Sequence, residues 1–283
     1  MRYNSSGFYE EKLSFLGLGG STFPTDENGL PDKEKCSALF KKAFKEGVTF
    51  FFVPFNAESG AEALFGENLS CLNRDEYFLS GGIPVDFLKG KNASEVFSEQ
   101  LARLKNGYFD YYIIENIGKE NFSYFIENDL YTVFSGLKAS GKIRHLGFSF
   151  SGTEEEWRFL LNSYVWDFVK MDFNFYKWDH LGADKLYRDL RKKGIPFIAS
   201  DPFMGGFILD PPEEVLEILH KGDPQYSMEE WALRWFFDKK GLLCIIADSS
   251  SAEQFSNYSD IISSSKTLNS QKKHYLKAAS EVL

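Results

Sequence analysis

The chain has little of what would place it in a membrane or on a nucleic acid. No apolar run approaches the ~20 residues needed to cross a bilayer, so a membrane partner is not expected. Its 32 Lys and Arg are outnumbered by 41 Asp and Glu, so that the net charge is -9. Nucleic-acid binding draws on clustered basic residues, and no nucleic-acid partner is expected either.

Cysteine is also scarce. Cys36, Cys71 and Cys244 are odd in number and widely spaced, and they form no Cys-x-x-Cys pair. This spacing suggests neither a disulfide framework nor a zinc or iron-sulfur site. The N-terminus has acids at Glu10 and Glu11 and only a short apolar run, whereas a secretory signal has a basic start and a long apolar stretch. We expect a cytoplasmic protein with three reduced, mostly buried thiols.

What the chain does have is ample core material and a regular alternation of short and long segments. Of its 283 residues 43% are hydrophobic, including 29 Phe. Eight short apolar runs alternate with longer segments of helical period, which is the pattern of βαβ units around a parallel sheet. The runs cover residues 13–18, 48–53, 76–81, 109–114, 144–149, 167–172, 196–200 and 242–247.

Eight such units without a break in composition favour an α/β fold that closes into a (β/α)8 TIM barrel, with a doubly wound open sheet as the alternative. We expect a single domain over residues 1–283, with the barrel at about residues 13–265 and a C-terminal helix at about residues 269–282. In a barrel, active sites lie on the loops after the carboxyl ends of the strands. The residues just after each strand are therefore the ones to examine.

Several helices have clear boundary signals. Residues 31–47 carry an apolar face and stop at Gly47, and residues 182–194 end with basic residues that oppose the helix dipole. Three further segments begin at residues that suit an N-cap: Ser94, Thr153 and Ser251. The apolar face of residues 226–237 is most simply packed on the barrel, with an oligomer interface as the alternative. The chain is expected to be a monomer or a small homo-oligomer.

Residues 136–152, GLKASGKIRHLGFSFSG, resemble the segment of aldo-keto reductases in which a helix ends in Gly-Lys-Ile-Arg and the fifth strand runs into Gly-x-Ser. Residues 17–23 and 45–69 resemble the first and second strands of that family. Residues 108–114, 192–206 and 245–258 resemble its fourth, seventh and eighth strands. The similarity covers residues 13 to 265. The chain also resembles a bacterial subgroup that often carries a C-terminal iron-sulfur domain, which we do not expect here because no Cys follows Cys244.

The resemblance implies a (β/α)8 barrel that reduces carbonyl compounds with NADPH. In the family a Tyr donates the proton, a Lys adjusts the pKa of that Tyr, a His orients the substrate and an Asp supports the Lys. The four positions fall here on Phe52 (Asp), Ala57 (Tyr), Gly82 (Lys) and Glu115 (His). A Tyr works as an acid near neutral pH only when its ionised form is stabilised, so these partners matter. With all four replaced, no catalytic residue carries over.

The family's cofactor positions are eroded as well. Ser149 keeps the serine that helps to hold the nicotinamide, whereas Phe150 replaces an Asn, Asp172 a Gln and Met204 an Arg. Asp248 puts an acid beside the phosphate-binding helix start. The residues that still suit a cofactor are Gly19, Gly20, Ser149, Ser249 and Ser250, and Tyr258 replaces a late Asn of the adenosine site. The serines cap a helix whose N-terminus suits a phosphate, but the carboxylate of Asp248 opposes it.

These departures predict a protein of oxidoreductase descent without the standard NADPH-dependent reaction, either a pseudoenzyme or a small-molecule-binding barrel. The alternative is a diverged oxidoreductase acting on an aldehyde or ketone with NAD(P)H, FMN or another cofactor. In that case Glu115 or a loop residue would donate the proton. The family implies NADP(H), but the sequence leaves the cofactor undetermined.

Four acids follow strands and suggest three interpretations: Glu115, Asp172, Asp201 and Asp248. They could bind a divalent metal or a cationic ligand. Glu115 and Asp201 could act as a carboxylate pair in glycoside hydrolysis. The simplest interpretation is that they pair with Lys and Arg at the rim, and it is the one we favour.

Nine aromatic residues are expected at the same strand ends, where they would form an aromatic ligand pocket or fill a disused one. They are Phe52, Phe55, Phe150, Phe173, Phe175, Tyr176, Trp178, Phe203 and Phe207. His145 is expected at the opposite end of the barrel as a packing residue, and His180 in a loop after the sixth strand.

Overall fold

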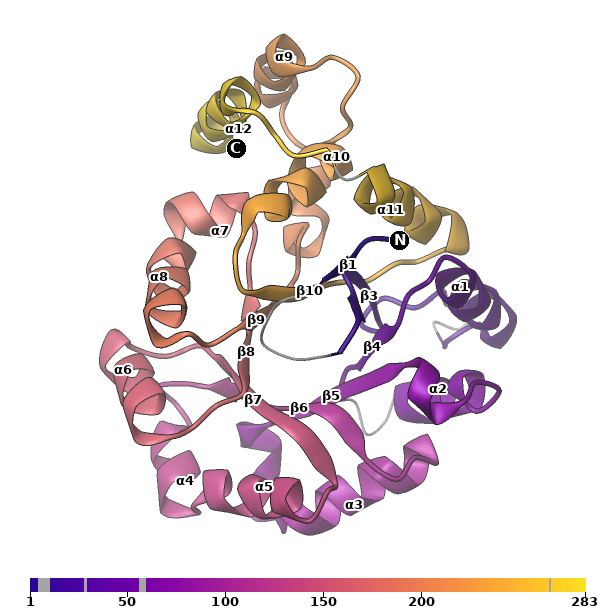
Figure 1. Cartoon of the computed structure of the whole chain (residues 1–283), viewed down its shortest axis with the longest axis vertical. Helices are drawn as coiled ribbons and strands as arrows, with labels where there is room; N and C mark the ends of the chain where they lie inside the picture. The colour runs from indigo at the N-terminus through magenta and orange to yellow at the C-terminus, as the bar shows by residue number, and fades with distance from the viewer. Residues whose placement is uncertain (5–10, 28–29, 56–59, 265) are drawn as a thin grey trace.

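Eight parallel strands form a closed barrel in the order β10-β3-β4-β5-β6-β7-β8-β9 (Figure 1), which confirms the predicted (β/α)8 architecture. The computed structural model describes residues 1–4, 11–27, 30–55, 60–264 and 266–283. The barrel strands are β3 (Leu16–Gly19), β4 (Phe50–Val53), β5 (Phe78–Pro84), β6 (Phe109–Ile117), β7 (Ile143–Phe150), β8 (Phe168–Asp172), β9 (Phe197–Ser200) and β10 (Leu242–Ala247).

The first predicted strand is divided in two. Leu13–Ser14 forms β2, which pairs antiparallel with β1 (Tyr3–Asn4), and the barrel strand begins only at Leu16. The Ser14 hydroxyl donates to the Leu16 carbonyl at 2.7 Å, which fixes the bend between the two pieces. The apolar run at residues 13–18 therefore contributes to an antiparallel strand pair as well as to the barrel.

Helices surround the barrel, with four short 3-10 segments between them (Figure 1). They are α1 (Lys33–Lys45), α2 (Ala61–Leu69), α3 (Ala93–Leu104), α4 (Phe122–Glu127), α5 (Leu130–Ala139), α6 (Glu154–Ser163), α7 (Phe175–His180), α8 (Ala183–Lys193), α9 (Glu213–Gly222), α10 (Met228–Arg234), α11 (Ala252–Ser264) and α12 (Ser270–Val282). The 3-10 segments are η1 (Arg74–Glu76), η2 (Val85–Leu88), η3 (Met204–Leu209) and η4 (Trp235–Asp238). Among these described helices, none has the length and apolar character to cross a membrane.

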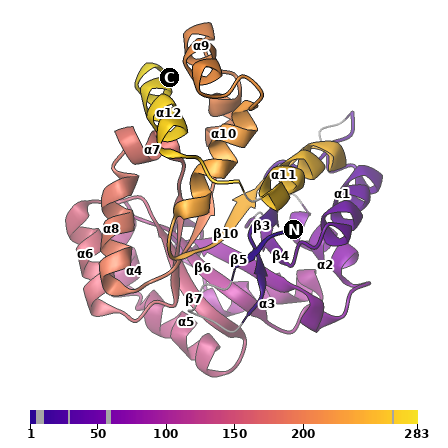
Figure 2. The same cartoon turned by 45° about the horizontal axis from the view of Figure 1, so that its top comes forward.

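Helices α9 and α12 lie side by side outside the main ring and project from it (Figure 2). The predicted C-terminal helix is thus present, and Asn269 caps it by accepting from the Lys272 N–H. The apolar face of residues 226–237 is buried, as expected for a segment packed on the barrel. Its buried members include Met228, Trp231, Ala232 and Trp235.

Two of the three predicted N-caps are confirmed. Thr153 forms a capping box with Glu156, and the Ser251 hydroxyl accepts from the Gln254 N–H at 3.1 Å. The third prediction, Ser94, is wrong. The Asn92 side chain accepts from the backbone N–H groups of Ser94 and Glu95, so α3 begins two residues earlier. Asn is as strong an N-cap as Ser, so the helix begins after Asn92.

The barrel has one apolar layer inside and another between the strands and the helices. The inner layer is filled by bulky side chains that include Phe50, Phe52, Tyr111, Phe168 and Ile198. Such filling is usual for an eight-stranded barrel, which is a packed core and not a pore. Polar side chains therefore gather above or below this layer, and the residues after the strands lie at the carboxyl ends.

Candidate functional site

A lysine that the sequence analysis did not single out lies at the mouth of the barrel. Lys170 projects from β8, and its ammonium lies 3.3 Å from the Glu115 carboxylate of β6 and 4.6 Å from the ring centre of Phe52 in β4. The Lys170 and Glu115 side chains are only 14% and 11% exposed. Because it projects from β8 and contacts residues of two other strands, the lysine reaches across the barrel interior.

This lysine contacts two of the four positions to which the family's catalytic residues map, and the third is adjacent. Phe52 is buried under the ammonium, and Glu115 is its ion-pair partner. A side chain on Gly82 would begin 2.6 Å from Glu115 Oε1 and 2.8 Å from the Ile113 carbonyl oxygen. The space of a lysine at position 82 is therefore taken by Glu115. Ala57, the fourth position, lies outside the described residues.

A second lysine pairs with two more of the acids at the strand ends. Lys177, in α7, lies 3.1 Å from Asp172 and 3.2 Å from Asp201. Burial alone would lower the pKa of Lys177, but the two carboxylates outweigh it and raise that pKa. The Ser200 hydroxyl also donates to Asp172 at 2.9 Å.

The acids are thus distributed over two cations. Glu115 pairs with Lys170, whereas Asp172 and Asp201 pair with Lys177, so three of the four acids follow the rim-pairing interpretation. The fourth, Asp248, accepts instead from the Ser21 N–H. Within the described ranges, no three His, Cys, Asp or Glu side chains are grouped so that they could hold a metal ion.

Beside the mouth lies a cavity of about 300 Å³ between the loop after β9 and the start of α11. Its lining includes Asp201, Phe203, Asp248, Ser250, Gln254 and Tyr258, and it contains two carboxylates but no Lys, Arg or His. The lining is therefore acidic, although Lys177, which lies outside it, pairs with Asp201. Tyr258 packs against Phe203 with ring centres 4.9 Å apart, and burial raises the pKa of Tyr258 to about 12.

Asp248 is the acid most affected by its surroundings here. Burial raises its pKa, against the opposing hydrogen bonds from Ser21 and the charge of Lys170, and Asp201 raises it further. One carboxylate oxygen accepts from the Ser21 N–H at 2.9 Å. The same oxygen fills the space where a side chain on Gly19 would begin. Gly19 thus serves the close approach of Asp248.

Several donors at the start of α11 are already used internally. The Gln254 side chain accepts from the Ser250 N–H at 2.9 Å, and the Ser249 hydroxyl donates to the same amide oxygen at 3.0 Å. The Ser251 hydroxyl accepts from the Gln254 N–H. A phosphate would have to displace these bonds before it could be held at this N-terminus.

The remaining cofactor candidates have structural contacts. The Ser149 hydroxyl accepts from the Asn116 N–H at 2.9 Å, where Asn116 has a φ of 58°. A side chain on Gly20 would begin 2.5 Å from the Phe65 ring. Phe150 packs on Trp157 with ring centres 5.3 Å apart.

The loop after β9 holds unusual backbone conformations next to the cavity. Asp201 and Met204 both have a φ of 54°, in the left-handed region that non-glycine residues rarely adopt. The Asp201 carboxylate accepts from the Gly205 N–H at 2.7 Å and stabilises this turn. Met204 itself is not among the residues that line the cavity.

The aromatic residues expected at the mouth do not form one cluster. Phe52 faces the barrel interior, whereas Phe173 packs among Trp178, Tyr187 and Trp235 in the outer layer. The remaining contacts are separate pairs: Phe55 with Phe87, Phe203 with Tyr258, and Phe207 with Tyr176. The reason is that only Phe52 and Phe150 lie in strands, whereas the others lie in the connections and helices that follow β4, β8 and β9.

His145 and His180 both contact neighbouring segments of the chain. His145 lies 2.9 Å from Glu11 and stacks on Tyr111, with ring centres 4.7 Å apart. His180 contacts the Ser280 carbonyl of α12 at 2.8 Å, which ties α7 to α12.

The fold is that of known reductases. The chain resembles the holo form of aldo-keto reductase AKR11C1 from Bacillus halodurans, with a TM-score of 0.78, 16% identity and coverage of 99% of this chain and 96% of that one. It resembles the thermostable aldo-keto reductase Tm1743 with a TM-score of 0.81, 18% identity and coverage of 99% and 100%. A Klebsiella pneumoniae aldo-keto reductase in complex with NADPH has a TM-score of 0.75, 17% identity and coverage of 94% and 91%.

No curated protein sequence matches the chain at a significant level. The family model described as the aldo/keto reductase family, however, matches residues 15–281, nearly the whole length. The chain therefore belongs to the aldo/keto reductase family of oxidoreductases.

Proposed function

We propose that this protein binds a small molecule at the mouth of its barrel and has lost the NADPH-dependent carbonyl reduction of its family. The observation that carries this proposal is the Lys170–Glu115 pair, which lies against Phe52 and occupies the side-chain space of Gly82. Three of the family's catalytic positions therefore lie in or against one packed ion pair. A Tyr at the fourth position would have no neighbouring Lys from position 82 to stabilise its ionised form.

The residues present do not fit NADP(H). A dinucleotide phosphate needs cations or free backbone donors, and the cavity at α11 offers two carboxylates and a helix start whose donors are engaged. A carboxylate about 4 Å from a phosphate charge costs about 4 kcal/mol at an effective dielectric constant near 20. That energy corresponds to a loss of affinity of nearly 1,000-fold.

The same charges favour a neutral or cationic ligand. Asp201 and Asp248 are the ionisable acids of the cavity lining, and of these Asp201 is already paired with Lys177. Phe203 and Tyr258 give the cavity an aromatic wall. Such a mixture of apolar walls and a few polar groups is typical of small-molecule sites. Asp248, whose pKa burial raises, would be stabilised as a carboxylate by a cationic group of the ligand.

A second candidate is a diverged oxidoreductase that uses Glu115 as its proton donor. Its support is the position of Glu115 beside Lys170 at the carboxyl ends of the strands, where barrel enzymes carry their chemistry. A screen of aldehydes and ketones with several redox cofactors distinguishes the two, because only this candidate gives turnover that is lost in Glu115→Gln.

The double variant Ala57→Tyr/Gly82→Lys tests the loss of the family reaction. We expect no NADPH oxidation with a panel of aldehydes, because Glu115 takes the space of the new lysine and the cofactor site is acidic. Adding Glu115→His and Lys170→Met removes the obstruction and completes a second test, in which we again expect no turnover. Circular dichroism establishes that the variants are folded. Substantial NADPH turnover by either variant would contradict the proposal.

A further inference from the structure

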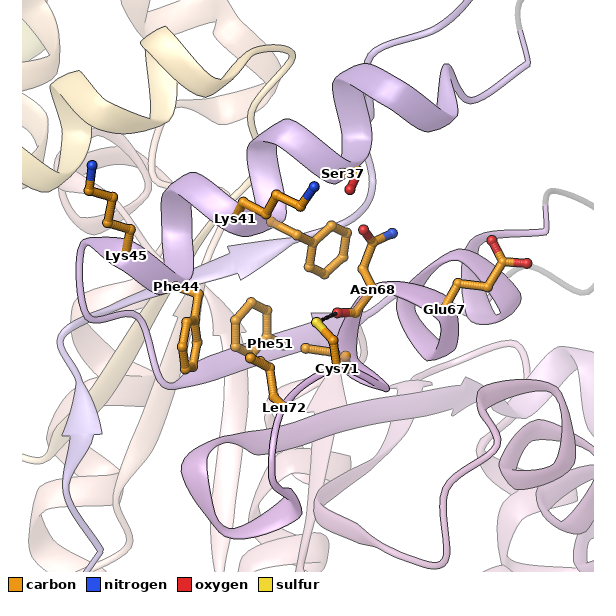
Figure 3. Close-up of a pocket in the computed structure, with 11 residues that line it drawn as sticks. Ser37, Lys41, Phe44, Lys45, Phe51, Glu67, Asn68, Cys71 and Leu72 are labelled. Carbon is orange, nitrogen blue, oxygen red and sulfur yellow. Dashed lines mark hydrogen bonds between the residues drawn. The ribbon is translucent and has the colours of Figure 1, made fainter.

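A second cavity, of about 240 Å³, lies on the outer surface of the barrel between α1 and α2 (Figure 3). It shares no lining residue with the cavity at the mouth. Its apolar wall consists of Phe40, Phe44, Phe51, Leu69 and Leu72, of which Phe40, Phe51 and Leu69 are buried. A ligand here would find an apolar surface supplied by two helices and one barrel strand.

The charge at this cavity that is not neutralised is positive. Lys41 and Lys45 both line it, and neither makes an ion pair with another residue in the described part of the chain. They lie four positions apart on one helix, a spacing at which like charges repel. Glu67 also lines the cavity, but it pairs with Lys33 at 3.7 Å and lies at the opposite end from Lys45 (Figure 3).

Most of the other polar groups are already engaged. The Asn68 amide donates to the Leu64 carbonyl at 2.9 Å, and the Cys71 thiol donates to the Asn68 carbonyl at 3.2 Å. In Figure 3 the Lys41 ammonium reaches toward Ser37 at the upper edge of the cavity. The edge therefore offers an ammonium and a hydroxyl, both of them donors to an anionic oxygen.

We propose that this cavity binds a short aliphatic carboxylate, with its alkyl chain on the Phe and Leu side chains and its carboxylate at Lys41 and Ser37. The cavity volume of about 240 Å³ has room for a short alkyl chain with a carboxylate, and octanoate is a suitable probe. A small inorganic anion would leave the apolar wall uncovered, and an alkylammonium would be repelled by the lysines. This site is separate from the mouth and goes beyond the function proposed for it.

Cys71 provides a reporter inside the cavity. It is exposed, whereas Cys36 and Cys244 are buried. Burial raises the pKa of Cys36 to about 11 and that of Cys244 well above its usual value, so neither reacts readily. A neutral maleimide should therefore label Cys71 selectively, which peptide mass spectrometry verifies.

The experiment measures the rate of maleimide labelling of the full-length protein with and without octanoate. We expect millimolar octanoate to slow labelling at least threefold, and octylammonium at the same concentration to leave it unchanged. Lys41→Gln/Lys45→Gln should weaken the apparent octanoate affinity about tenfold, because the charge-assisted contacts are removed. The matched control Lys35→Gln/Lys42→Gln makes the same charge change on the same helix at residues that do not line the cavity, and it should retain protection.

Three results would overturn the proposal. They are equal protection by octylammonium, unchanged protection in the Lys41/Lys45 variant, and no protection by millimolar octanoate. Circular dichroism of each variant shows whether a loss of protection reflects unfolding.

Discussion

At the scale of single residues, Lys170 connects residues of different strands at the mouth of the barrel. Its ammonium is the group that contacts both Phe52 and Glu115, and removing it would leave Glu115 without its cation in a largely buried place. Breaking a buried ion pair from one side is costly because the remaining charge is desolvated without compensation.

Lys170→Met is therefore expected to lower the free energy of unfolding by about 3 kcal/mol. The double variant Lys170→Met/Glu115→Gln should recover most of this loss, since no unpaired charge remains. Urea denaturation of the wild type, both single variants and the double variant gives the coupling energy. Strictly additive effects of the two substitutions would contradict a direct Lys170–Glu115 interaction.

Asp248 gives the stability of the protein a defined dependence on pH. Its pKa is raised in the folded state, chiefly by burial, so the folded chain binds this proton more tightly than the unfolded chain. The carboxyl group thus costs no stability below the unfolded pKa of about 3.9. The stability that comes from this tighter proton binding is lost as the pH rises through the folded pKa of Asp248.

Asp248→Asn is expected to gain stability relative to the wild type as the pH rises from about 4 to 7. Denaturation curves of both proteins across this range measure the difference. The control is Asp223→Asn, because Lys272 lowers the pKa of Asp223 and the expected trend has the opposite sign. A difference for Asp248→Asn that does not change with pH would contradict the assigned shift.

The sequence could predict which residues were replaced but not what replaced them in space. The resemblance located Phe52, Gly82 and Glu115, and the structure brings these three together. Lys170 was missed because it was read as part of an apolar strand. The available signal was strand alternation, since Phe168, Lys170 and Asp172 share one face of β8 and Phe168 lies in the inner layer.

At the scale of secondary-structure elements, one predicted strand ended too early at a pair of glycines. The prediction ended one strand at residue 81, whereas β5 continues to Pro84. Gly81 and Gly82 are in the strand because of close contacts. A side chain on Gly81 would begin 2.6 Å from the Phe109 ring, and one on Gly82 would meet Glu115. Close approach to a neighbour across the sheet is not visible in a local sequence window.

Helix packing gives a matched pair of glycine variants. A side chain on Gly66, in α2, would begin 2.5 Å from the Leu104 carbonyl oxygen at the end of α3, whereas one on Gly136, in α5, would meet nothing within 4 Å. We expect Gly66→Ala to lower the free energy of unfolding by about 1–3 kcal/mol through overpacking. Gly136→Ala should raise it by up to about 1 kcal/mol through helix propensity. Thermal unfolding that shifts both variants in the same direction would contradict this packing.

At the scale of the whole molecule, the alternation of apolar runs and helical segments favoured a closed barrel over an open sheet, and the structure confirms the barrel. The strands were predicted within a few residues because each is a continuous apolar run covered on both sides. The cavities could not be predicted in the same way. The acidic cavity combines Thr22, the loop after β9 and the start of α11, and the outer cavity combines α1, β4 and α2. Their shapes depend on side-chain positions in segments that are far apart along the chain.

At this scale we propose that the barrel has exchanged the cofactor chemistry of its family for an acidic small-molecule site. The charge of the cavity and the engaged donors at α11 belong to no single residue, so they are tested best by the cofactor itself.

The most direct measurement is a calorimetric titration of the purified protein with NADPH, NADP⁺ and NADH. The account predicts no saturable binding of any of the three at about 1 mM ligand. Saturable binding, above all with a dissociation constant below about 10 μM, or roughly -7 kcal/mol, would mean that a nicotinamide cofactor site survives and would contradict the account.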